Sequence, residues 1–144
     1  MDTPEKYIVM VSGSRLKTRA AVIPSDLQAL KQIEQYIYTT LIDLISSLHA
    51  RFKHLIFIAG GASSGADKII KDICEKYNYT YKGFKPDFSD GYAAWKFFER
   101  NIEMLKTCNL AVCFWDGQSA GTKHVIENAL KLKKDLQVYF LPKS

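Results

Sequence analysis

Small residues between a strand-like run and a helical pattern mark the first stretch that could do chemistry. Residues 56–59 are Ile-Phe-Ile-Ala, and residues 60–65 then supply three glycines and two serines. Apolar residues return at helical spacing with Ile69, Ile70 and Ile73. A strand that ends in such a loop and opens a helix aims backbone N–H groups and the positive end of a helix dipole at one place. The stretch predicts a phosphate site, and a plain strand-to-helix turn is the alternative.

The spacing of these glycines differs from the known phosphate fingerprints. Gly60, Gly61 and Gly65 do not form G-x-G-x-x-G, and Ala66-Asp67 stands where a P-loop requires Lys followed by Ser or Thr. Hydrolysis of a nucleoside triphosphate is therefore disfavoured. The carboxylate of Asp67 suits either a capping role near the start of the helix or a hydrogen bond from a ribose hydroxyl.

Two more strand-like runs end in the same way. Residues 7–12 lead into a Gly-Ser-Arg loop, and residues 109–115 lead into small and polar residues at 116–122. Ligands of parallel sheets lie outside the carboxyl ends of the strands, where the strand order reverses. We therefore expect the three loops to meet at one crevice. The candidate ligand-binding residues in these loops are Gly13, Ser14, Arg15, Gly60, Gly61, Ala62, Ser63, Gly65, Asp67, Asp116, Gly117, Ser119, Gly121 and Thr122.

Positive side chains follow the third loop directly. Lys123 and His124 fall in the first turn of a helix expected to run to about Lys133. Positive charge at the positive end of a helix dipole costs a few tenths to about 1 kcal/mol per charge, and a bound anion would remove this conflict. A Lys123 side chain screened in solvent is the alternative. For His124, a structural or surface role is favoured over a catalytic one.

Arg100 and Asn101 lie near the middle of a helix predicted over residues 92–106. Aromatic and aliphatic residues flank the arginine, so its guanidinium is partly shielded from water. A shielded guanidinium needs a carboxylate or a phosphate as partner. A ligand phosphate would supply one, and an ordinary salt bridge to Glu99 or Glu103 is the alternative.

Strand-like and helical segments alternate along the chain, which is typical of an α/β fold with a mostly parallel sheet and right-handed crossovers. Of the common strand orders, 3-2-1-4-5 places the loops after the first, second and fourth strands side by side, so we expect that order in a five-stranded sheet. Residues 79–84 alternate aromatic and polar and predict an edge strand. Strands are expected at residues 7–12, 54–59, 79–84, 109–115 and 136–141, and helices at 25–50, 66–77 and 92–106, with a last helix that follows the junction at 116–122 and runs to about Lys133.

The long predicted helix over residues 25–50 carries two apolar stripes. A surface helix normally needs one. The second stripe indicates either a wide buried face or a subunit contact, which makes this helix the candidate interface of a homo-oligomer. The first stripe consists of Leu27, Leu30, Ile33, Ile37, Leu41, Leu44 and Leu48, and the second of Tyr38, Ile42 and Ile45.

Composition indicates a single globular domain over residues 1–144, because 47% hydrophobic residues suffice for a buried core. No secretory pattern or membrane-length apolar stretch is present, so we expect a cytoplasmic protein without membrane contact. Cys74, Cys108 and Cys113 have spacings unlike C-x-x-C and predict buried free thiols rather than disulfides or zinc ligands. The net charge of +5 suits an anionic ligand or a nucleic acid.

Three motifs stand in order along the chain: Val11-Ser12-Gly13-Ser14-Arg15, the Gly60-Gly61-Ala62 to Gly65-Ala66-Asp67 loop, and Arg100-Asn101-x-x-Met104 followed by residues 114–122. Together they resemble the YpsA-related branch of the SLOG superfamily, which is common in bacteria and phages. This resemblance covers most of the chain and implies a Rossmann-like three-layer sandwich that binds nucleotides or nucleotide-derived ligands, often as a dimer or higher oligomer.

Relatives within that superfamily include the cytokinin-activating phosphoribohydrolases, in which Arg-x-x-x-Met and Gly-Thr-x-x-Glu motifs supply a catalytic arginine and glutamate. Arg100 and Met104 match, as does Gly121-Thr122, but Val125 occupies the position of the glutamate. Glu127 lies two residues later, a rotation of about 200° on a helix. Hydrolysis of an N-glycosidic bond by that mechanism is therefore disfavoured. The remaining catalytic candidates are Arg100, Asp116 and Glu127.

The leading interpretation is a binding protein for a phosphate-containing nucleotide or nucleotide-derived signal, such as an ADP-ribose-like molecule or a cyclic nucleotide, acting as a sensor or by sequestration. Loop amides would hold phosphates, Arg15 and Arg100 would supply charge, and Trp95 or Tyr92 could stack on a base. A nucleotide N-glycoside hydrolase is the alternative. Nucleic-acid binding ranks last, because the lysines are scattered. No metal or other cofactor is expected, since no H-E-x-x-H or nucleophile elbow is present.

Overall fold

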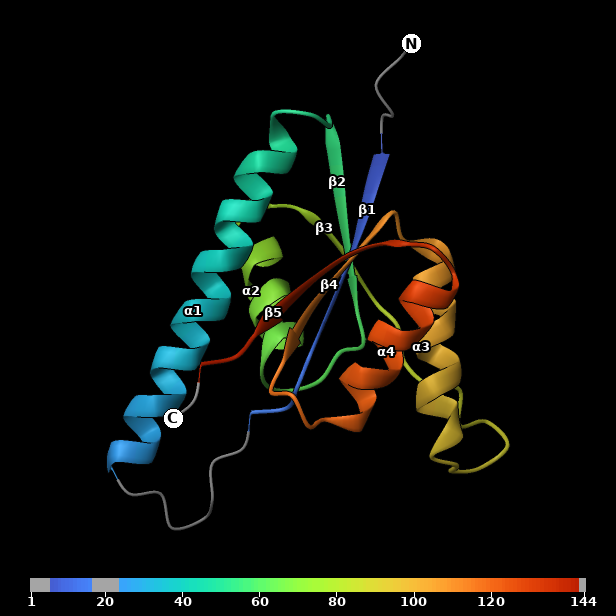
Figure 1. Ribbon diagram of the computed structural model, residues 1–144. Helices are drawn as coiled ribbons and strands as arrows, with labels where there is room; N and C mark the ends of the chain where they lie inside the picture. Colours follow the sequence, from blue (N-terminus) through green and yellow to red (C-terminus); the bar gives the residue numbers. More distant parts are fainter. Residues whose placement is uncertain (1–5, 17–23, 143–144) are drawn as a thin grey trace.

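The computed structural model describes residues 6–16 and 24–142. Within them, five strands form one parallel sheet in the order β3-β2-β1-β4-β5, which confirms the predicted order. Helices α1 and α2 lie on one face and α3 and α4 on the other (Figure 1), a Rossmann-like α/β arrangement. The elements are β1 (Lys6–Gly13), α1 (Pro24–His49), β2 (His54–Ala59), α2 (Ala66–Tyr77), β3 (Thr80–Gly83), α3 (Trp95–Thr107), β4 (Leu110–Trp115), α4 (Ala120–Lys131) and β5 (Asp135–Phe140).

The sheet separates two apolar cores. Val9 and Val11 of β1 belong to the core under α1 and α2, whereas Met10 between them belongs to the core under α3 and α4. Val112 and Ala111 of β4 divide in the same way. Successive side chains of a strand point to opposite faces, so a strand covered on both sides must be apolar throughout. This explains the continuous apolar runs of the central strands.

Helix α1 buries only part of the stripe that the sequence predicted as core-facing. Ile37, Leu41 and Leu48 in its C-terminal part are buried, but Leu27 near its N-terminus is 42% exposed. In Figure 1 the N-terminal turns of α1 extend past the end of β5, so the sheet does not reach them. The prediction of one continuous buried stripe is therefore wrong for Leu27, because α1 is longer than the sheet beneath it.

The second stripe of α1 contacts the rest of the same chain. Ile45 is buried, and Tyr38 and Ile42 pack partly against the same core. The hydroxyl oxygens of Tyr38 and Tyr77 of α2 lie 3.3 Å apart. The wide-face alternative therefore accounts for this stripe.

The three cysteines are buried free thiols, as predicted. Burial raises the pKa of the Cys74 and Cys113 thiols to about 12 in each case. These groups stay protonated at neutral pH and act as small apolar side chains. None of the helices in the described ranges is long and apolar enough to cross a membrane.

Candidate functional site

A cavity of about 930 Å³ lies where β1, β2 and β4 end. The ends of these strands are at the lower edge of the sheet in Figure 1. The three small-residue loops form one side of it and helix α3 with its preceding loop forms the other. The loops meet because β2, β1 and β4 are neighbours in the sheet. From the loops come Ser12, Gly13, Arg15, Gly60, Gly61, Ala62, Asp67, Asp116, Gln118, Ser119, Gly121 and Thr122, and from the α3 side Lys85, Pro86, Phe88, Ala94, Phe97, Phe98, Arg100, Asn101 and Met104.

Most predicted ligand-binding residues thus share one cavity, but some lie outside its lining. Ser14 is buried and joins two loops: its N–H donates to the Phe114 carbonyl at 2.9 Å, and its Oγ accepts from the Asp116 N–H at 3.1 Å. Ser14 therefore links the loop after β1 to the end of β4 and to the loop that follows β4. The predicted residues outside the lining are Ser14, Ser63, Gly65, Trp95 and Gly117.

Gly65 has a packing role at the start of α2. Its φ of 73° lies in the region that favours glycine. A Cβ added there would lie 3.0 Å from the Ser14 carbonyl oxygen. The glycine therefore lets the start of α2 approach the loop after β1.

Main-chain carbonyls hold the guanidinium of Arg100. Nη1 donates to the Gly60 carbonyl at 3.1 Å and more weakly to the Phe84 carbonyl at 3.5 Å, and Nε donates to Asn101 Oδ1 at 3.2 Å. Gly60 and Phe84 directly follow β2 and β3, so the ends of two strands position the side chain. A Cβ on Gly60 would lie 2.6 Å from Nη1, so any larger residue there would displace the guanidinium.

No carboxylate within 4.0 Å pairs with Arg100 in the part of the chain that the structure describes, where the ion pairs are Lys68 with Asp72 and Lys123 with Glu127. The alternative salt bridge to Glu99 or Glu103 therefore does not form there. Burial lowers the pKa of Arg100, and the charge of Asp67 acts in the opposite direction. A partly desolvated guanidinium without a paired carboxylate favours an anionic ligand.

Asp67 lies in the cavity lining, where its Oδ2 accepts a hydrogen bond from the Ala62 N–H at 3.1 Å. Desolvation raises the pKa of this carboxyl, while the Ala62 N–H and the charge of Arg100 act against the rise. The carboxylate therefore closes the loop after β2. The start of α2 itself has no side-chain cap.

Asp116 closes the loop after β4 with its own side chain. Its Oδ1 accepts hydrogen bonds from the N–H groups of Gln118 at 2.8 Å and Ser119 at 2.7 Å. Desolvation raises the pKa of Asp116, but the two N–H groups outweigh it and hold the pKa below its ordinary value. Two of the loop amides from which phosphate binding is expected, those of Gln118 and Ser119, therefore already have an acceptor within the loop.

The first turn of α4 remains open to the cavity. Gly121 and Thr122 line it, and α4 has no side-chain cap. The N–H groups of a first helical turn have no intrahelical acceptor. They are therefore the donors of this loop that a ligand anion can reach.

The charged residues after this turn lie outside the cavity lining. Lys123 Nζ is 3.8 Å from Glu127 Oε1 on the exposed side of α4. The side chain of Lys123 therefore faces solvent, which is the alternative that the sequence left open. The ring of His124 packs on Phe98 with 4.3 Å between centroids, and its buried Nδ1 has no hydrogen-bond partner. Desolvation lowers the pKa of His124, which favours the neutral imidazole. Its placement matches a structural role.

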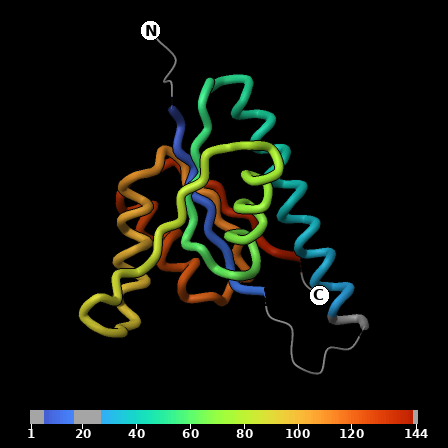
Figure 2. The backbone as a smooth tube through the Cα atoms, turned by 180° about the vertical axis from the view of Figure 1, so that it is seen from behind, coloured from blue at the N-terminus to red at the C-terminus, as the bar shows by residue number. Residues whose placement is uncertain are grey.

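Sequence reasoning missed the aromatic wall of the cavity. Phe88 and Phe97 line it with rings in edge contact at 5.5 Å, whereas Trp95 and Tyr92, the expected stacking residues, are 59% and 76% exposed and outside the lining. Helix α3 starts at Trp95 rather than Tyr92, and residues 84–94 form a loop (Figure 2). A sequence pattern that could have indicated this wall is the seven-residue spacing of Phe97 and Met104, which lie on either side of Arg100 in the helix.

No metal cluster is present in the described ranges: no three His, Cys, Asp or Glu side chains there lie close enough to hold a metal ion. Charge in the lining comes from Arg15, Lys85 and Arg100 against Asp67 and Asp116. The chemistry that this arrangement offers is recognition of a negatively charged group beside aromatic rings.

Comparison with known proteins gives no assignment. No family model matches the chain, and no curated protein matches it. A similar solved structure is a crystal structure from Listeria monocytogenes with a provisional assignment as UDP-N-acetylglucosamine 2-epimerase, at 11% sequence identity and a TM-score of 0.41. The match covers 92% of this chain and 30% of that chain, so the chain spans less than a third of its neighbour. A likeness of this extent says nothing about activity or ligand.

Proposed function

We propose that the cavity binds a phosphate-containing nucleotide or a nucleotide-derived signal, such as an ADP-ribose-like molecule or a cyclic nucleotide, and that the protein acts as a sensor or by sequestration. Arg100 is the observation that carries this proposal. Its guanidinium lines the cavity, is oriented by the Gly60 and Phe84 carbonyls, and has no carboxylate within 4.0 Å among the described residues. The two carbonyls fix the orientation of the guanidinium without neutralising its charge, so a bound phosphate would contact a cation that is already oriented.

The other charges around the cavity support the same proposal. Arg15 and Lys85 add positive groups to the lining. The carboxylates of Asp67 and Asp116 already accept hydrogen bonds from backbone N–H groups. The lining therefore carries more positive than negative charge, which favours an anionic ligand over a cationic one.

We also propose that the chain is a distant member of the YpsA-related SLOG branch and a homo-oligomer that associates through α1. Residues from all three motifs of the resemblance line the one cavity, which supports the first point. The observation behind the second is that α1 extends past the sheet and leaves Leu27 42% exposed. The first predicts nucleotide binding in the ligand panel below, and sedimentation velocity tests the second.

A nucleotide N-glycoside hydrolase is the second candidate, and Asp67 is the observation that favours it. Its carboxyl lines the cavity with a pKa raised by desolvation, a property of general acids. Asp116 is held in a turn, and Glu127 lies outside the lining. Chromatography of nucleotides incubated with the protein separates the candidates: products that disappear with Asp67→Asn indicate hydrolysis, and unchanged nucleotide recovered from the protein after denaturation indicates binding.

A thermal-shift panel of nucleotides tests the proposed binding. Any ligand that binds the folded state raises its stability by RT ln(1 + [L]/Kd), about 2.7 kcal/mol at a hundred times Kd. Arg100→Gln should weaken a stabilising nucleotide by about 10- to 150-fold, because a hydrogen bond to a charged group contributes about 1.5–3 kcal/mol. Lys106→Gln is the matched control, since Lys106 is an exposed cation on the same helix and outside the lining.

Two results would contradict the proposal. One is a panel in which no nucleotide shifts the melting temperature of the natural protein. The other is an Arg100→Gln variant that keeps the full shift while Lys106→Gln also keeps it.

A further inference from the structure

We infer that Phe88 and Phe97 form a stacking platform for the base of the bound nucleotide, so that the cavity takes a nucleobase-bearing phosphate in preference to a sugar phosphate or free pyrophosphate. This inference rests on the proposed function, because it places the phosphate at Arg100. It adds that the base of the ligand is recognised, and that Phe88 and Phe97 are the residues that contact it.

The platform is open aromatic surface facing the cavity. Phe88 lines the cavity and is 37% exposed, and its ring contacts that of Phe97 edge-on with 5.5 Å between centroids. Tyr92 packs against the ring of Phe88 at 5.3 Å, outside the cavity lining. Tyr92 therefore packs against one part of this aromatic cluster, and the exposed part of Phe88 is in contact with solvent in the cavity. A flat apolar group that covers the open part is stabilised by burial and by aromatic stacking.

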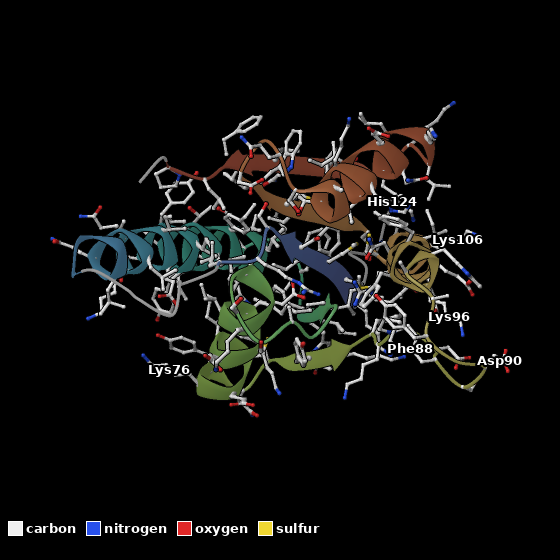
Figure 3. All side chains as sticks on the ribbon, turned by 90° about the horizontal axis from the view of Figure 1, so that it is seen from below. Lys76, Phe88, Asp90, Lys96, Lys106 and His124 are labelled. Atoms are coloured by element: carbon white, nitrogen blue, oxygen red, sulfur yellow. The ribbon has the colours of Figure 1, made fainter. Side chains whose placement is uncertain are left out.

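The loop that carries Phe88 is held in place before any ligand binds. The Ser89 N–H donates to Asp87 Oδ1 at 3.0 Å, and the Gly91 N–H donates to the Phe88 carbonyl at 2.9 Å. Lys96 Nζ donates to the Gly91 carbonyl at 2.9 Å and lies 5.9 Å from the centre of the Phe88 ring, as their positions in Figure 3 illustrate. A ring fixed in this way loses little conformational freedom on binding.

Helix α3 sets the distance between the platform and the phosphate position. Phe97 and Arg100 are three residues apart, a rise of about 4.5 Å along a helix, and so lie on the same face. The Arg100 Cζ is 5.6 Å from the centre of the Phe97 ring. A base on the ring and a phosphate on the guanidinium are then neighbours that one sugar can connect. A nucleoside phosphate has this arrangement.

The size of the cavity and the position of the other aromatic residues favour this ligand class. A volume of about 930 Å³ is within the range of small-molecule and cofactor sites and far exceeds the need of a free phosphate. A sugar phosphate would leave both phenylalanine rings in water. Trp95 and Tyr92 lie outside the lining, whereas Phe88 and Phe97 belong to it together with Arg100.

Calorimetric titration with ADP and with inorganic pyrophosphate tests the platform, because the two probes differ by adenosine. Phe88→Leu and Phe97→Leu keep apolar volume and remove the ring. Each should raise the Kd for ADP on the order of tenfold, the effect of losing a base–aromatic stack. Phe88→Leu should leave the Kd for pyrophosphate unchanged, because Arg100 packs over the ring of Phe97 and not over that of Phe88. Phe88→Tyr keeps the ring and should bind ADP as the natural protein does. Phe140→Leu is the control, since Phe140 is an exposed ring on β5 outside the cavity.

Equal weakening of ADP and pyrophosphate, or no weakening of either, would overturn the platform while leaving the proposed function standing. Absence of any nucleotide binding by the natural protein would instead overturn the proposed function. A measurement on the natural protein covers the case in which the leucine variants do not fold. Stacking moves the adenine H2 and H8 proton resonances upfield on binding, and unshifted resonances of bound ADP would contradict the platform.

Discussion

The loops after β2 and β4 look alike in sequence and differ in what they offer a ligand. After β2, the Gly60 carbonyl accepts a hydrogen bond from Arg100, so this loop positions a cation. After β4, Asp116 satisfies the first N–H groups of its own loop, and the free donors lie further on, around Gly121. The loop after β2 orients a cation in the cavity lining, and the loop after β4 brings the first turn of α4 to that lining.

The helices that follow the two loops differ as well. The first residue of helix α2 packs against the loop after β1, and Gly65 and Ala66 are buried there. Helix α4 starts in open space, since a Cβ added at Gly121 would meet nothing within 4 Å. Both dipoles have the same sign, but only the exposed helix end can bring its N–H groups to a ligand. Glycine content alone therefore does not identify the anion-binding helix.

Gly60→Ala is the strongest way to break this comparison. The added Cβ would lie 2.6 Å from Arg100 Nη1 and 2.8 Å from Cζ, so the flexible arginine must leave the carbonyl. We expect affinity for a stabilising nucleotide to fall by about 10- to 150-fold, with little loss of stability. Titration calorimetry measures the affinity, and thermal unfolding measures the stability.

Gly83→Ala serves as the control for this change, because an added Cβ there meets Tyr81 at an ordinary 3.5 Å and lies outside the cavity. Unchanged affinity in Gly60→Ala would mean that the carbonyl does not position Arg100 for the ligand.

Gly13→Ala tests the buried start of α2. The added Cβ would lie 2.9 Å from Ala66 Cβ and 3.2 Å from the Phe114 carbonyl oxygen, and neither atom belongs to a flexible side chain. Overpacking of this kind costs about 1–3 kcal/mol of unfolding free energy. Urea unfolding measures the loss against the Gly83→Ala variant. A Gly13→Ala variant as stable as that control would mean that α2 can move away from β1 at no cost.

The carboxylates of the two loops should respond to pH with opposite signs, and this is the smallest expected effect. The pKa of Asp67 is raised above the ordinary 3.8, so its contribution to stability is favourable below that value and is lost as pH rises through the folded pKa. The pKa of Asp116 is lowered, so its contribution is present above 3.8 and is lost as pH falls through the folded pKa.

Asparagine at each position keeps a carbonyl oxygen and removes the charge. At neutral pH, Asp67→Asn should therefore be more stable than the natural protein and Asp116→Asn less stable. Both differences should shrink at about pH 3. Urea unfolding at the two pH values measures them. The same sign for both variants at neutral pH would show that the two carboxylates do not differ in the way their surroundings indicate.

Much of the fold and the meeting of the three loops at the candidate site could be predicted, because both depend on the order of repeating elements. Apolar runs indicated the strands, and helical spacing indicated the helices. The rule for parallel sheets then placed the three loops side by side from the expected strand order. The aromatic wall could not be predicted in this way. Phe88 lies in a turn sequence, and the start of α3 at Trp95 sets which ring faces the cavity.

Arg100 illustrates the boundary between sequence and tertiary structure. Its apolar neighbours in the sequence already indicated a shielded cation that needs an anionic partner. The sequence by itself determined the alternation of strands and helices and the buried thiols, since both follow from local patterning. It also indicated the strand order and the meeting of the three loops, because the rule for parallel sheets relates the small-residue loops to one another. Only the tertiary structure decided that backbone carbonyls hold Arg100, that Asp116 occupies its own loop and that α4 opens to the cavity. Those outcomes depend on main-chain atoms and helix phase, which residue types do not encode.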